Sequence, residues 1–203
     1  MESEPWKNIN WRSVSMQEID ALVNQGADVN QKEYIQFDRH KKMESTPLFC
    51  AIVNNNLSAV VGLLKNKANP NADLSLEGEN SPKVNLMDTV TNPLILKYMI
   101  RCGGKINPQK LINLCHAFLT TFETVDKKIY SPLIQIMWDY FQSDKTIQEK
   151  LIREIELFKN PFKTKQSQIT INRNKQQLLR KIIGKKSNLR LSSLSHGNAK
   201  ELL

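Results

Sequence analysis

The chain has 203 residues, of which 40% are apolar and 24% are charged, so it has enough apolar side chains to form a folded core. Its net charge of +9 is unevenly distributed: residues 1–158 carry 18 basic and 19 acidic side chains, whereas residues 159–203 carry 11 basic side chains and one acidic one. This composition excludes a chain that is disordered throughout and places the basic character in the C-terminal segment.

The first predicted helix begins at a capping box formed by Ser15 and Glu18. Four apolar residues are expected to face the core from this helix: Met16, Ile19, Leu22 and Val23. The preceding segment, residues 5–14, is expected to form a weaker helix. Its two tryptophans, Trp6 and Trp11, are candidates for covering an open end of the fold.

The clearest pattern is TPLFCAIVNNNLSAVVGLLKNKANPNA, residues 46–72, which predicts two short helices joined by a tight turn. Thr46 can cap the first helix, and Pro47 stands in the first turn, where its missing N–H costs nothing. Asn55 and Asn56 suit the turn because asparagine tolerates the left-handed conformation. The apolar residues expected on the inner faces are Leu48, Ala51, Ile52, Val60, Leu63 and Leu64.

A five-residue motif recurs after each predicted second helix. It is GADVN at residues 26–30, KANPN at 67–71 and GGKIN at 103–107, so the spacings are 41 and 36 residues. Recurrence of one closing motif after successive helices is typical of a repeat array.

Two further helix pairs are predicted after the clearest one. In the third pair, Pro82-Lys83-Val84 stands where Thr46-Pro47-Leu48 begins the preceding pair, and residues 92–107 contain the second helix and the closing motif. A fourth pair, roughly residues 109–122 and 131–142, lacks the closing motif, as expected for a terminal unit of an array.

Residues 46–72 resemble the ankyrin repeat, and the match runs without a gap despite Phe49 and Lys67 in place of the usual histidine and glycine. The resemblance implies an all-α solenoid of about four helix-pair units. Because the spacings exceed the ankyrin period of about 33 residues, the resemblance also implies an elongated first finger loop. Ankyrin repeats have no chemistry of their own, so the implied function is the binding of another protein through the loop tips and the concave face.

The long loop QKEYIQFDRHKKMES, residues 31–45, is the most unusual local feature, since extra length in a repeat array often lies on the binding face. Alternation over residues 34–39 suits an extended finger. A second loop, residues 73–82, is acidic. The candidate partner-binding residues on the two loops are Tyr34, Phe37, Arg39, Lys42, Met43, Glu77 and Glu79. The alternative is that Ile35 and Phe37 pack back onto the solenoid and the rest of the loop is solvated.

Nothing in the sequence predicts a catalytic residue, a metal site or a cofactor. Cys115 and His116 are adjacent on a predicted helix, so their side chains diverge by about 100° instead of meeting. The three cysteines lack metal-ligand spacing, and the seven glycines form no phosphate-binding loop. We therefore expect a non-enzymatic protein with reduced thiols and no small-molecule substrate.

The C-terminal segment contains two predicted amphipathic helices. Residues 144–162 present Ile147, Leu151, Ile155 and Phe158 on one face and are expected to cap the array. Residues 172–191 combine an apolar stripe with a basic face. The basic residues of that face are Lys175, Arg180, Lys181, Lys185 and Lys186. This face suits an anionic membrane surface, a nucleic-acid backbone or a targeting signal; alternatively, the stripe packs on the capping helix while the lysines stay in water.

The predicted organisation is an ankyrin array at 1–143, a capping helix at 144–162, and a basic helix with a flexible tail at 163–203. No apolar run reaches the ~20 residues of a membrane span, and the acidic N-terminus lacks the apolar core of a Sec signal peptide.

The asparagine, lysine and isoleucine bias and the polar tail LSSLSHGNAKELL are similar to those of ankyrin-containing effectors that intracellular bacteria deliver through type IV secretion. The resemblance implies a virulence protein, cytoplasmic or secreted into a host cell without a Sec signal peptide, that binds a host protein. The alternative is an adaptor localised by its basic helix.

Overall fold

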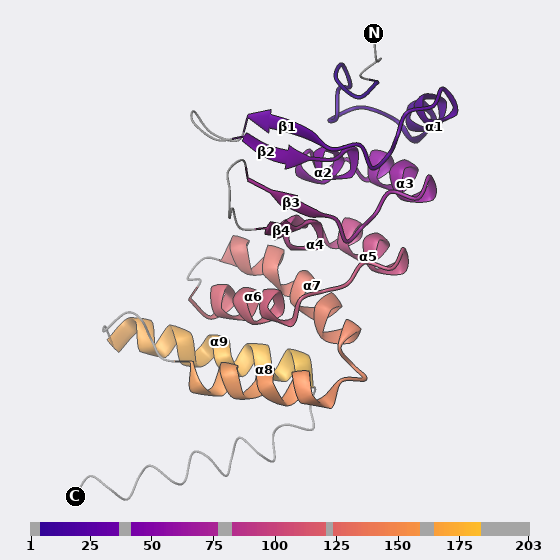
Figure 1. Cartoon of the computed structure of the whole chain (residues 1–203). Coiled ribbons are helices and arrows are strands. Elements are labelled where there is room, and N and C mark those ends of the chain that lie inside the picture. Colours follow the sequence, from indigo (N-terminus) through magenta and orange to yellow (C-terminus); the bar gives the residue numbers. More distant parts are fainter. Residues whose placement is uncertain (1–4, 37–41, 77–82, 121–123, 159–164, 184–203) are drawn as a thin grey trace, which may run out of the picture. The chain divides into compact units, whose positions relative to one another are not determined.

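The computed structural model describes residues 5–36, 42–76, 83–120, 124–158 and 165–183, and these residues form a mostly helical fold with two short β-hairpins (Figure 1). The chain divides into two compact units, residues 1–107 and residues 108–203. The prediction of a mostly helical protein is therefore confirmed.

The first unit contains α1 (Met16–Asn24), β1 (Glu33–Gln36), β2 (Lys42–Ser45), α2 (Pro47–Val53), α3 (Leu57–Lys65), β3 (Asp73–Ser75), β4 (Lys83–Asn85), α4 (Leu86–Thr89) and α5 (Pro93–Arg101). Figure 1 shows α1, α3 and α5 stacked in sequence order along one side of this unit, with the two hairpins on the other side. Helix α3 packs against α1, α2 and α5, so it forms the centre of the unit.

The helix starts follow from capping side chains. Ser15 and Glu18 form the predicted capping box of α1, the Thr46 hydroxyl accepts from the backbone N–H of Phe49 at the start of α2, and Asn56 caps α3 in the same way. Asn55 has a φ of 56°, which confirms the left-handed turn predicted between α2 and α3.

The three recurring motifs close their helices with one geometry. Gly26, Lys67 and Gly103 have φ values of 96°, 67° and 89°, and each donates its backbone N–H to the carbonyl three residues earlier. The next residue in each motif bonds the carbonyl five residues earlier, and a left-handed residue satisfies the last carbonyls of a helix in this way.

Two equivalent asparagines then join consecutive loops. The side chain of Asn30 accepts from the N–H of Asn69 at 2.8 Å, and that of Asn71 accepts from the N–H of Lys105 at 2.7 Å. The Asn71 amide also donates to the Gly103 carbonyl at 2.9 Å. The loops therefore form a repeating hydrogen-bonded edge along the first unit.

Much of the core of the first unit is formed by apolar residues that helical periodicity predicts, but Leu74 on β3 and Leu86 at the start of α4 are fully buried without having been predicted. Helix α1 crosses α3 closely because Gly62 has no side chain: a Cβ there would lie 3.2 Å from the Cα of Met16 and 3.2 Å from the Cβ of Ile19. The most deeply buried members of this core are Ile19, Leu48, Ala51, Val60, Leu63, Leu74, Leu86, Ile95, Leu96 and Met99.

Two predictions for the first unit are corrected. Residues 5–13 form turns without a helix, because the Trp6 indole bonds to the Asp28 carbonyl and stacks on Trp11. Residues 83–85 form strand β4, and the helix that follows has only four residues. Its start is delayed because Asn85, whose side chain accepts from the N–H of Met87, is the first effective cap.

The second unit contains α6 (Pro108–Thr120), α7 (Thr124–Tyr140), α8 (Lys145–Leu157) and α9 (Lys165–Ile183). Helix α6 packs against the other three helices. The side chain of Asn174 in α9, fully buried, donates to the carbonyls of Phe118 and Leu119 near the end of α6. The last carbonyls of an α-helix have no partner within the helix itself, and the Asn174 amide supplies hydrogen bonds to two of them.

The helices of the fourth predicted pair share a compact unit with α8 and α9, whereas the sequence suggested an array that ends at residue 143. The physical reason is the burial of Leu151 and Ile155 on α8 and of Leu178 on α9. Helix α8 ends at Leu157; residues 159–162 of the predicted capping helix lie outside the described residues.

Candidate partner-binding site

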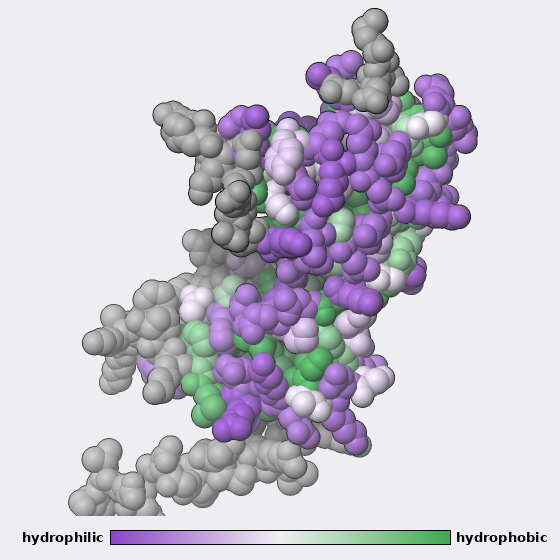
Figure 2. Space-filling model, in the orientation of Figure 1, coloured by the Kyte–Doolittle hydropathy of each residue, from purple (hydrophilic) through white to green (hydrophobic). Residues whose placement is uncertain are grey.

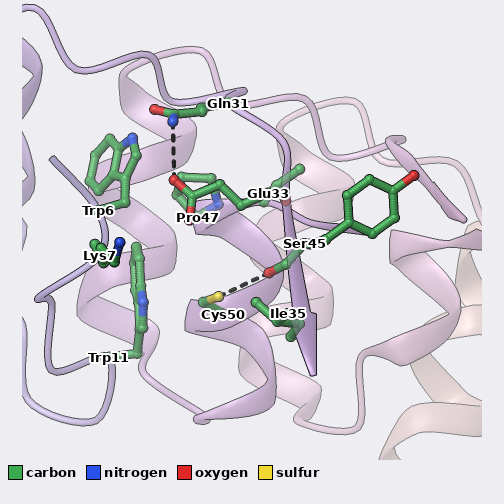
Figure 3. Close-up of a pocket in the computed structure, with 11 residues that line it drawn as sticks. Trp6, Lys7, Trp11, Gln31, Glu33, Ile35, Ser45, Pro47 and Cys50 are labelled. Carbon is green, nitrogen blue, oxygen red and sulfur yellow. Dashed lines mark hydrogen bonds between the residues drawn. The ribbon is translucent and has the colours of Figure 1, made fainter. Parts of the chain in front are cut away.

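A pocket of the first unit lies between the N-terminal turns, the first hairpin and the start of α2, and has a volume of about 360 Å³. Figure 3 shows Trp6 and Trp11 on one side and Ser45, Cys50 and Ile35 on the other. This volume is within the range of small-ligand pockets, and concave sites of this size also receive single side chains of a partner.

The tryptophan wall is held in place by two contacts. The Trp6 indole N–H donates to the Asp28 carbonyl at 2.8 Å, and the ring centroids of Trp6 and Trp11 are 5.9 Å apart with an interplanar angle of 29°. Trp6 is buried, with 4% of its surface exposed, whereas Trp11 is half-buried. The burial of Trp6 is compatible with the predicted role of covering an end of the fold, while Trp11 lines the pocket with part of its ring.

The opposite wall contains polar groups that bond to each other. Ser45 Oγ and Cys50 Sγ are 3.1 Å apart, and the Gln31 amide donates to the Glu33 carboxylate at 3.0 Å (Figure 3). Burial raises the pKa of the Cys50 thiol, the Ser45 hydroxyl lowers it in part, and the Glu33 carboxylate raises it again. The thiol therefore stays protonated at neutral pH, and it suits a packing role better than that of a nucleophile.

The first hairpin positions the rim of this pocket. Strands β1 and β2 pair antiparallel, with Tyr34 opposite Glu44 and Ile35 opposite Met43, and Met43 also forms a bridge to Leu76. The burial of β1 alternates between half-buried and exposed residues, so residues 34–36 are extended as predicted, while residues 37–39 of the predicted finger lie outside the described residues.

An ion-pair network connects the two hairpins. The Lys32 ammonium lies 3.1 Å from the Glu44 carboxylate and also donates to the Asp73 carbonyl, while the Ser75 N–H donates to Glu44. Partial burial alone would raise the pKa of Glu44, but the bonds from Lys32 and Ser75 outweigh it and lower the pKa. The two hairpins are therefore held side by side in the first unit.

The structure places the predicted contact residues unequally. Tyr34 is 55% exposed at the pocket rim, and Lys42 is exposed on β2. Met43 was predicted to contact a partner at the surface. This prediction is wrong, because its side chain is only 5% exposed and its backbone pairs with Leu76. Phe37, Arg39, Glu77 and Glu79 lie outside the described residues. Hydrophilic residues predominate on the face of the first unit that Figure 2 shows.

Sequence reasoning missed Gln31, Glu33 and Cys50 as pocket residues. No sequence motif marks them, since the pocket forms only when the hairpin folds beside the N-terminal turns. The available signal was the pair of tryptophans within a short polar segment.

The basic residues of the C-terminal helix are also placed unequally. Lys175 is half-buried and donates to the Glu156 carbonyl, and burial lowers the pKa of its ammonium, an effect that Glu156 partly offsets. Arg180 and Lys181 are exposed, and Lys181 also bonds to Ser131. Lys185 and Lys186 lie outside the described residues.

The apolar stripe of this helix is packed within the second unit. Leu178, Leu179 and Ile182 are 1%, 3% and 6% exposed. The three apolar side chains are therefore packed against protein, which is the structural alternative stated above, and among the described residues they are not available to a membrane or nucleic-acid surface. Within the part of the chain that the structure describes, no helix is long and apolar enough to span a bilayer.

Cys115 and His116 have different surroundings on α6. Burial raises the pKa of Cys115 to about 12, and the His116 ring packs on Phe158 with centroids 4.9 Å apart. The described residues include no group of three histidine, cysteine, aspartate or glutamate side chains placed to hold a metal ion. Comparisons of the chain with protein-family models, with curated proteins and with solved structures found no match.

Proposed function

We propose that the chain is an ankyrin-type repeat protein whose function is to bind another protein, without a catalytic reaction of its own. Many unrelated helices end in the left-handed geometry seen at Gly26, Lys67 and Gly103, so the proposal depends on the recurrence of the motif together with the bonds between successive closures. Asn30 and Asn71 then link consecutive closures in the same way, which favours a solenoid of stacked units.

The first hairpin is the proposed contact surface. It is held beside the second hairpin by Lys32, which donates to the Asp73 carbonyl, and by Glu44, which accepts from the Ser75 N–H. Paired strands such as β1 and β2 lose less conformational entropy when a partner docks than an unpaired segment would. Tyr34 supports the proposal further, since exposed aromatic side chains are frequent anchors in protein interfaces.

The assignment to a secreted bacterial effector stays a prediction, as does the alternative of an adaptor on a membrane or nucleic acid. The effector hypothesis depends on the tail at residues 191–203, and the adaptor hypothesis depends in part on Lys185 and Lys186; all of these lie outside the described residues.

The test is affinity capture from a cytosolic extract with the wild-type chain and two Tyr→Ala variants, followed by quantitative mass spectrometry. Tyr34→Ala is expected to lose at least one captured protein. Tyr140→Ala is the matched control, because this tyrosine is also exposed, at 39%, but lies in the second unit. Identical capture by wild type and Tyr34→Ala, with both proteins equally stable, would reject the hairpin as the contact surface.

A further inference from the structure

Several polar side chains that line the Trp6–Trp11 pocket already have interaction partners in the protein. Ser45 bonds to Cys50, and the Thr46 hydroxyl caps α2 by accepting from the N–H of Phe49. Lys7, on the tryptophan side, takes part in an interaction of its own.

Glu33 differs from these groups. Its carboxylate accepts one hydrogen bond from the Gln31 amide, and among the described residues it forms no ion pair. A carboxylate has about four acceptor positions, so Glu33 keeps unused capacity at the edge of a largely apolar pocket.

The remaining walls are suited to an alkyl chain that ends in a positive charge. Trp6, Trp11, Ile35 and Pro47 provide apolar surface, and tryptophan is the aromatic residue that attracts a cation most strongly. An aromatic face combined with an uncompensated carboxylate is complementary to an ammonium or guanidinium group and not to an anion.

The strand beside the pocket, β1, is an edge strand among the described residues. Within the described residues, β1 pairs with β2 and with no other strand, and its side chains alternate along the pocket rim. An extended segment of a partner can add to such an edge through its backbone while one of its side chains enters the neighbouring pocket.

We propose that this pocket binds a lysine or arginine side chain of the protein partner, from a segment that lies extended along β1, with the charge on Glu33 and the alkyl stem against Trp11. The inference rests on the proposed protein-binding function and specifies its chemistry. A neutral apolar side chain would bury the Glu33 carboxylate without a partner, and an acidic one would meet a like charge, so both are disfavoured.

The test uses capped pentapeptides of sequence Thr-Val-X-Val-Thr, in which X is lysine, norleucine or glutamate, titrated into the ¹⁵N-labelled full chain. The readout is the chemical shift of the indole N–H of each tryptophan. Trp6 and Trp11 report on the pocket, and Trp138, in the second unit, is the internal control. The lysine peptide is expected to move the Trp11 signal, and to bind about fivefold more tightly than the norleucine peptide.

Glu33→Gln is expected to reduce lysine-peptide binding to the norleucine level, whereas Asp88→Asn, which removes an exposed carboxylate elsewhere in the first unit, is expected to leave it unchanged. The proposal is overturned if the norleucine or glutamate peptide binds as tightly as the lysine peptide. It is also overturned if about 10 mM lysine peptide moves no pocket signal. If the peptides fail while Tyr34→Ala still loses its captured protein, only the pocket assignment fails; if Tyr34→Ala has no effect either, the hairpin function fails as well.

Discussion

The side chain of Asn71 joins two consecutive loops, so its removal tests whether the repeated loop closures stabilise the first unit. In the substitution Asn71→Ala, the N–H of Lys105 loses an acceptor at 2.7 Å and the carbonyl of Gly103 loses a donor at 2.9 Å. Asn30→Ala removes the equivalent contacts one unit earlier. There the Asn30 side chain accepts from the N–H of Asn69 at 2.8 Å, but it donates to the Lys67 carbonyl at 3.4 Å.

The expected magnitudes follow from these distances. Each well-formed hydrogen bond contributes about 1 kcal/mol, so Asn71→Ala is expected to lower the free energy of unfolding of the first unit by about 2 kcal/mol. A donor–acceptor distance of 3.4 Å lies outside the usual range, so Asn30→Ala is expected to cost about 1 kcal/mol. For a unit of this size, 2 kcal/mol corresponds to a fall in Tm of about 10 °C.

The assay is urea unfolding followed by amide hydrogen exchange, because exchange reports the two units separately. Asn24→Ala is the matched control, since Asn24 is an exposed residue at the end of α1 and alanine favours a helix. Faster exchange is expected in residues 16–107 of Asn71→Ala and not in α6–α9. The reasoning is refuted if Asn71→Ala unfolds at the same urea concentration as Asn24→Ala, or if Asn30→Ala is the more destabilised variant.

Three further substitutions test other contacts. Gly104→Ala would place a Cβ 2.6 Å from the Met87 sulfur, so a loss of about 1–3 kcal/mol is expected in thermal unfolding; an unchanged Tm would contradict the packing. The backbone N–H of Ser15 donates to the Glu18 carboxylate and lowers its pKa, so the stability that wild type gains over Glu18→Gln is expected to be present at pH 7 and to fade as the pH drops through that carboxyl's titration. Urea unfolding at several pH values measures this difference, and a pH-independent difference would contradict the reasoning. Asn174→Leu removes the α9 amide that donates to two carbonyls at the end of α6, so urea unfolding of the second unit is expected to show a loss of about 2 kcal/mol. Asn113→Leu, at an exposed position on α6, is the control, and an equal loss in this control would argue against the cap.

The helix pair at residues 46–72 was predictable almost residue by residue. Thr46 caps, Pro47 stands in the first turn, and Asn55 adopts the left-handed turn, as expected. These features depend on backbone preferences within a few residues, so sequence contains most of the information that determines them.

The N-terminal segment shows where local reasoning fails. Residues 5–14 were expected to form a helix, yet the indole of Trp6 bonds to a carbonyl 22 residues away and its ring stacks on Trp11. These contacts outweigh a weak helical preference, and they create one wall of the pocket. Met43 failed as a surface residue for a related reason, because only the pairing of the hairpins determines which face of β2 is buried.

By itself, the sequence determined the helix pair within residues 46–72, the caps at Ser15 and Thr46, and the spacing of Gly26, Lys67 and Gly103, because periodicity and capping are local properties of the chain. The tertiary structure alone decided that residues 108–120 pack in a unit with α8 and α9, that the basic helix buries its apolar stripe, and that Glu33 faces a tryptophan-lined pocket. Each of these depends on contacts between segments far apart in the chain, whose free energies no short stretch of sequence specifies.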